Sequence, residues 1–243
     1  ERTVPLVHQV VNGSKREQRA ELELDALRVA ARAIEQLVAE RDGVLAVEQV
    51  VPLIDKWFGD HRSGPNTKAR ILELPDQNDA GFESGNILLS PLTIDDTTML
   101  LSASQLLTDL YVPSRHEWIS HGLASYAQAR YMEEEKGRTS ALAYLEMHRE
   151  GMVSAESQAK PDQAASHSLI NSSDDSYVRA KAMNVWWMLR DIVGEQAFTG
   201  ALHSYKEPDD KDAYYMQKLI EAQSHRDLEW FFDDWVYRNP GLP

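Results

Sequence analysis

The stretch RHEWISHGLASY, from Arg115 to Tyr126, contains two imidazoles and a carboxylate, the side-chain groups that zinc sites use. Two histidines of one helix hold a zinc ion when they are four residues apart, because such residues lie only about 40° apart around the helix axis. His116 and His121 are five residues apart, which places them about 140° apart on a regular helix. They cannot chelate one ion from such a helix, so the likeness to an H-E-x-x-H pattern is a coincidence of spacing.

Glu117 and His121 are four residues apart, and this spacing suits either a shared metal ion or a surface ion pair. A metal site needs a third ligand, and no residue of the sequence is placed to supply it. The remaining histidines are dispersed and have no ligand spacing. We therefore predict no metal site and take the ion pair as the ordinary interpretation.

The composition excludes several other kinds of chemistry. The chain has no cysteine, so disulfides, thiolate zinc sites and a cysteine nucleophile are absent. The motifs G-x-S-x-G, G-x-G-x-x-G and the P-loop are absent too. The net charge is −14 with no cluster of Lys or Arg, which argues against nucleic acid and against an anionic membrane surface as partners.

No targeting signal or membrane span is visible, because no apolar run approaches the roughly 18 residues that a span needs. The lack of cysteine does not assign a compartment, since larger extracytoplasmic proteins can also lack it. The chain begins with Glu1 rather than Met. We therefore expect a processed form, or a domain that has partner domains in a larger chain.

Apolar periodicity predicts the elements that must position these residues. Short apolar runs predict strands at 4–11, 69–74 and 86–90, whereas steps of three and four residues predict helices at 24–38, 47–58 and 97–110. After residue 110 the pattern is helical throughout, apart from a polar stretch at 154–176 that we predict to be a loop.

These elements predict an α+β fold in one domain, residues 1–243. It consists of a small mixed-sheet α/β lobe over about 1–95, followed by a mainly helical lobe over about 96–243.

Four segments, in order between Gly81 and Pro243, read GFESGNILLS, WISHGLASYAQARY, KAMNVWWMLRDIVGEQAF and DLEWFFDDWVYRNPGLP. Together they resemble the catalytic domain of the M1 family of zinc aminopeptidases, which are gluzincins with a thermolysin-like fold. The segment around His121 is similar to the family's W-L-N-E-G-F-A-x-Y helix, and an upstream loop and strand are similar to its G-x-M-E-N segment. Two later segments resemble its K-G-A helix and its closing helices.

The resemblance implies a zinc site whose ligands are missing. His121 stands where the family has its third zinc ligand, a glutamate. The helix that would carry H-E-x-x-H aligns so that its two histidines fall at Ala103 and Leu107 and its catalytic glutamate falls at Ser104. We therefore expect no bound zinc and no other cofactor; zinc would be the cofactor only if the site had been rebuilt.

Two further positions follow from the same resemblance. The family's transition-state tyrosine aligns with Arg179, which could still stabilise an oxyanion. Its glutamate that binds the substrate amine aligns with Glu83, which suits either a retained amine-binding role or a solvated loop. We take Glu83, His121 and Arg179 as candidate substrate-binding residues.

Three hypotheses of function remain. The first is a catalytically inactive relative of the M1 aminopeptidases that binds a peptide or a protein. The second is an active peptidase or other hydrolase with a rebuilt, non-standard site. The third is a structural or interaction domain of a larger protein. We predict the first, because the scaffold matches while the residues that perform the chemistry do not.

Overall fold

The computed structural model describes residues 46–59, 70–74, 82–84, 87–90, 95–150, 152–153 and 168–238. The chain divides into two units, Glu1–Asp42 and Gly43–Pro243, and every described residue belongs to the second. The strand predicted at 4–11 and the helix predicted at 24–38 lie outside the described residues, and the single domain over 1–243 stays a prediction.

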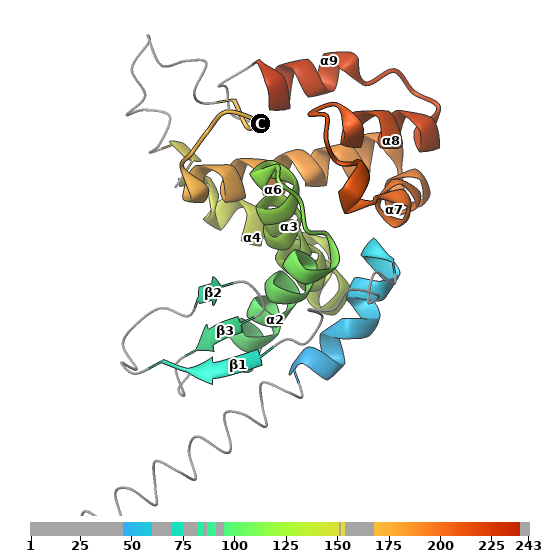
Figure 1. Ribbon diagram of the computed structural model, residues 1–243. Coiled ribbons are helices and arrows are strands. Elements are labelled where there is room, and N and C mark those ends of the chain that lie inside the picture. Colours follow the sequence, from blue (N-terminus) through green and yellow to red (C-terminus); the bar gives the residue numbers. More distant parts are fainter. Residues whose placement is uncertain are drawn as a thin grey trace, which may run out of the picture. The chain divides into compact units, whose positions relative to one another are not determined.

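Helices make up most of the described chain (Figure 1). Residues 46–58 are helical, as the sequence predicts. After the strands come α2 (Asp96–Tyr111), α3 (Glu117–Lys136), α4 (Arg138–Met147), α6 (Asp175–Val193), α7 (Glu195–Ser204), α8 (Tyr215–Ser224) and α9 (Glu229–Phe232), which runs into a short π-helix, η3 (Asp233–Tyr237). A 3-10 turn, η2 (Glu207–Asp209), lies before α8.

Three short strands form one small sheet in the order β1-β3-β2. They are β1 (Arg70–Glu73), β2 (Phe82–Ser84) and β3 (Ile87–Ser90). β1 runs parallel to β3, whereas β2 is antiparallel to it. The sequence predicts β1 and β3 from their apolar runs but places β2 in a polar loop.

The predicted α+β fold class is wrong, because the sheet does not make a lobe of its own. Its strands have four, three and four residues, and α2 packs directly against β2 and β3. Apolar runs locate strands but do not reveal how far a sheet extends, so the described chain is a mainly helical fold with a small sheet attached.

The core is built around α3, which packs against α2, α4 and α6 (Figure 1). Its first four turns are buried on nearly all sides, with Trp118, Ile119 and Leu123 fully enclosed. A helix surrounded in this way loses the polar face of an ordinary surface helix. The residues of the opening stretch therefore have fixed neighbours on three other helices.

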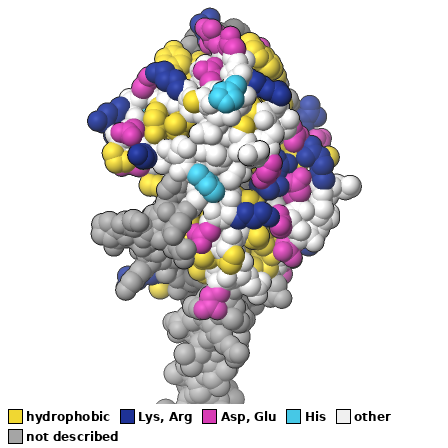
Figure 2. Space-filling view, turned by 90° about the vertical axis from the view of Figure 1, so that its right-hand side faces the viewer, with side chains coloured by type: hydrophobic (Ala, Val, Ile, Leu, Met, Phe, Trp, Pro, Cys, Tyr) yellow, Lys and Arg dark blue, Asp and Glu magenta, His cyan; other side chains and the backbone are white. Residues whose placement is uncertain are grey.

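Outside this core the surface is mixed in charge. Figure 2 shows Lys and Arg side chains interspersed with Asp and Glu on the face that it presents, with no gathering of basic groups there. Among the described residues, no helix combines the length and the apolar character that crossing a membrane requires.

Candidate functional site

The crossing of α3 and α6 fixes the frame of the site. Gly122 lies at this crossing, where an added Cβ would approach the Cβ of Ala182 to 2.5 Å and Nε1 of Trp186 to 2.9 Å. Trp186 donates its indole N–H to the carbonyl oxygen of Trp118 at 3.0 Å, and the two indole rings stack with centroids 4.8 Å apart. Glycine is required because the two backbones approach too closely for any side chain.

A cluster of three polar residues lies beside this crossing, and we call it the His121 cluster. His121 of α3 places its Nδ1 2.6 Å from Oδ1 of Asp175, the first residue of α6. Arg179, one turn further along α6, donates from Nε to Oδ2 of the same carboxylate at 2.8 Å. Asp175 thus joins His121 and Arg179, two of the three residues that the sequence nominates for substrate binding.

The charges within the His121 cluster support one another. Burial alone would raise the pKa of Asp175, but hydrogen bonds and positive charge from Arg179, and then from His121, hold it below its ordinary value. The carboxylate is therefore ionised at neutral pH and orients the imidazole. About a third of the His121 side chain is exposed.

Asp175 is not predicted from the sequence, because the polar stretch 154–176 is typical of a loop. The helix begins at Asp175, after Asp174, whose side chain accepts from the backbone N–H of Tyr177 as an N-cap. The spacing of Asp175 and Arg179, four residues apart, is the signal that could have revealed the pair.

The positions on α2 that would carry an H-E-x-x-H motif are packed into the core. Ala103 and Ser104 are fully buried, and Leu107 is 4% exposed. Ser104 donates its hydroxyl to the carbonyl oxygen of Leu100 at 2.8 Å, one turn back on the same helix. None of these three side chains offers an imidazole or a carboxylate.

Metal-binding groups do not assemble elsewhere in the part of the chain that the structure describes, where no three His, Asp or Glu side chains gather closely enough for a metal ion. His8, His61 and His167 lie outside those residues. Glu117 is exposed, and His121 hydrogen-bonds Asp175 rather than Glu117. Glu83 lies in β2 opposite Leu88 of β3, but the position of its side chain is not described, so its role stays a prediction.

His116 has a different partner from His121. It precedes α3 as the N-cap residue, and its Nδ1 lies 3.0 Å from Oδ1 of Asp210. Asp210 is almost fully buried and also accepts hydrogen bonds from Ser114 and, at 2.8 Å, from the hydroxyl of Tyr205. The two histidines of the opening stretch thus belong to two separate clusters.

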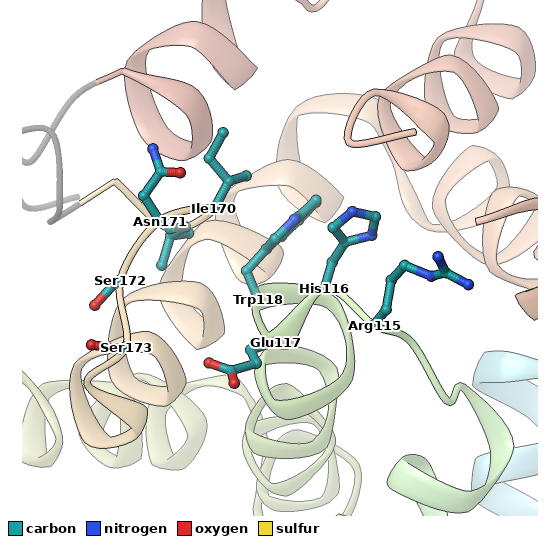
Figure 3. Close-up of a pocket in the computed structure, with 9 residues that line it drawn as sticks. Arg115, His116, Glu117, Trp118, Ile170, Asn171, Ser172 and Ser173 are labelled. Atoms are coloured by element: carbon teal, nitrogen blue, oxygen red, sulfur yellow. The ribbon is translucent and has the colours of Figure 1, made fainter. Parts of the chain in front are cut away.

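A hollow of about 260 Å³ lies at the beginning of α3, and we call it the α3 hollow. Figure 3 shows Asn171, Ser172 and Ser173 on one side of it and His116 and Arg115 on the other, with the indole of Trp118 between them. The N-cap residue makes no side-chain hydrogen bond to the first turn, whose Ile119 and Ser120 N–H groups donate to the carbonyl oxygen of His116. Such walls suit the polar groups of a peptide.

Comparisons with known proteins support the fold alone. No family model matches the chain, and no curated protein matches it. Among solved structures, the M1 zinc metallopeptidase from Deinococcus radiodurans superposes with a TM-score of 0.59 at 17% identity over 82% of this chain. A point mutant of that peptidase gives a TM-score of 0.58 at 19% identity over 82% of this chain, and the same mutant bound to a Tyr-Ser-Ala substrate gives 0.58 at 18% over 80%.

The described fold therefore resembles that of an M1 zinc metallopeptidase. This chain spans a little under half of the length of those structures, 45% of the unmutated peptidase and 46% and 44% of the two mutant structures.

Proposed function

We propose that this chain is a catalytically inactive relative of the M1 zinc peptidases that retains the scaffold to bind a peptide or a segment of a protein. The observation that carries the proposal is the burial of Ala103, Ser104 and Leu107 in α2. A peptidase of this class needs two imidazoles to hold zinc and a carboxylate to activate the bound water. Methyl, hydroxyl and isobutyl groups enclosed in a core supply neither.

The peptide-binding half of the proposal is supported by the polar walls of the α3 hollow. A peptide presents N–H and C=O groups in alternation, and here it meets the imidazole of His116, the amide of Asn171 and the guanidinium of Arg115. Ile170, about a third exposed, adds an apolar contact at the same place. One of the structures with a similar fold is a peptidase bound to a tripeptide, which makes peptide the ligand class to test first.

The test has two arms on the full chain. Elemental analysis of protein purified without chelator should find no stoichiometric zinc, and aminoacyl substrates should not be cleaved with or without added zinc. Mixed short peptides should shift the NMR signals of residues 115–118 and 169–173. Stoichiometric zinc with chelator-sensitive cleavage would refute the proposal that the chain is catalytically inactive. Peptides that leave these NMR signals unchanged would refute the proposal that it binds peptides in the α3 hollow.

The His121 cluster supports a second candidate, a hydrolase with a rebuilt site. A carboxylate that orients an imidazole is the arrangement of many general bases, and an arginine beside it suits a developing negative charge. If this candidate holds, a substrate screen should find cleavage that His121→Ala removes and that Glu135→Ala, an exposed change near the end of α3, leaves intact.

A further inference from the structure

The wall of the α3 hollow contains a buried hydrogen-bond donor that has no acceptor among the described residues. Trp118, one of the wall residues, is fully buried, and its indole nitrogen has no hydrogen-bond partner. The other indole of the same stack differs, because Trp186 donates its N–H to the carbonyl oxygen of Trp118. The indole N–H groups of Trp57 and Trp187 also lack an acceptor, but neither residue lines this hollow. A buried donor without a partner is unfavourable, so an acceptor from outside the protein would stabilise it.

The indole of Trp118 lies between the two sides of the hollow. Figure 3 shows it projecting between Ile170 on one side and the imidazole of His116 on the other. Its nitrogen is covered in the structure, so a side chain of the wall must move before a ligand atom can reach the N–H. Side-chain movements of this kind are common where a ligand binds. Because an indole only donates, the ligand atom must be an acceptor.

The charges at this end of α3 favour an acceptor that is negative. The first N–H groups of a helix carry a partial positive charge, and α3, with 20 residues, has no side-chain cap at its N-terminus. Arg115 is an exposed wall residue that makes no ion pair with any described residue. Glu117 opposes this charge, but it is exposed, and Figure 3 shows its carboxylate directed away from the indole of Trp118. The guanidinium and the helix end therefore attract an anionic group to the hollow.

We propose, on the basis of the peptide binding proposed above, that the α3 hollow takes up a carboxylate of the peptide, with one oxygen accepting from the indole N–H of Trp118 and the charge paired with Arg115. A carboxylate fits these groups because it has two acceptor oxygens, which match the planar fork of a guanidinium. The carboxylate belongs either to the C-terminus of the peptide or to an acidic side chain.

Two matched peptides test for the carboxylate on the full chain. N-acetyl-Ala-Ala ends in a free carboxylate, whereas its carboxamide form is uncharged and otherwise the same. In NMR titrations the free acid should move the indole N–H signal of Trp118 downfield, as expected for a new hydrogen bond. It should bind about three- to tenfold more tightly than the carboxamide, which is the contribution of a partly exposed pair of carboxylate and guanidinium.

Two variants test the two binding groups separately. Arg115→Gln should lower the affinity of the free acid to that of the carboxamide. Lys136→Gln is the matched control, because it removes the same charge at the last residue of α3 and should leave both affinities unchanged. Trp118→Phe removes the indole N–H but keeps the carbonyl oxygen that Trp186 binds, and it should also weaken the free acid. If Trp118→Phe does not fold, the indole signal of the native protein and the Arg115 variant still decide the result.

A third peptide, N-acetyl-Ala-Glu with a carboxamide end, identifies the source of the carboxylate. If it binds more tightly than N-acetyl-Ala-Ala, the source is an acidic side chain, and the reverse order identifies the C-terminus. Equal affinities of the free acid and the carboxamide would overturn the carboxylate site and leave the proposed peptide binding intact. No binding of any of these peptides would overturn both. Inorganic phosphate that binds more tightly than the free acid would also overturn the carboxylate site.

Discussion

Trp186 donates its indole N–H to the carbonyl oxygen of Trp118, and the stacked rings of these two residues lie across the point where α6 crosses α3. This hydrogen bond satisfies the buried indole N–H of Trp186, which would cost free energy if it had no acceptor. The stacked rings also cover the first turn of α3. This contact, together with Gly122, sets the distance between the helices that carry His121 and Asp175.

Gly122→Ala should destabilise the protein by about 1–3 kcal/mol, because the new methyl group would overlap Ala182 and the indole nitrogen of Trp186. Urea unfolding followed by circular dichroism measures the change. Gly200→Ala is the matched control, since Gly200 is also helical but its added methyl would meet only the end of the Gln223 side chain. There, helix propensity should offset the contact or increase the stability. Equal losses in the two variants would contradict the close crossing.

Glu133 of α3 holds two nearly buried arginines, and Glu133→Gln should therefore cost about 1–3 kcal/mol of unfolding free energy. Arg190 donates to it from two nitrogens, at 2.6 and 3.2 Å, and Arg130 donates to it as well. Glu134→Gln provides the control one residue along, where the lost contact is a partly exposed ion pair with Lys56 worth about 0–1 kcal/mol. Similar urea midpoints for the two variants would show that the arginines do not need Glu133.

The sequence predicts those features of the fold and the site that depend on residues close together in the chain. The helices around His121 follow from apolar steps along the chain, and the positions of Ala103, Ser104 and Leu107 follow from the register of one helix. The partner of His121 does not, because Asp175 lies 54 residues further along and only the packing of α6 on α3 brings it near.

Two errors have the same origin. β2 has three residues, and its pairing with β3 is visible only in the sheet, so Phe82–Ser84 read as a loop. The sheet lobe is predicted from three apolar runs, at 4–11, 69–74 and 86–90, and the last two form strands of only four residues each.

Acid should weaken the fold partly through Glu133. Burial tends to raise the pKa of this carboxyl, but hydrogen bonds and charge from Arg190 and Arg130 hold it below the ordinary value of 4.5. A group with a lowered pKa stabilises the fold fully above its unfolded-state pKa, and this stability is lost as the pH falls through the folded-state value. The difference in unfolding free energy between the native protein and Glu133→Gln should thus shrink below pH 4.5. A difference that stays constant down to pH 3 would contradict this linkage.

Asp210→Asn should destabilise the protein by about 1–3 kcal/mol, although it changes only one atom. The carboxylate is almost fully buried and accepts from Ser114, His116 and Tyr205, while an amide must present a donor where one of these donors now points. Asp209→Asn is the matched control, because Asp209 is its exposed neighbour in η2. Because His116 lines the α3 hollow, the Asp210 variant should also bind a peptide there with lower affinity. Urea unfolding does not measure this loss of affinity. A variant with native stability would show that the buried carboxylate does not anchor the beginning of α3.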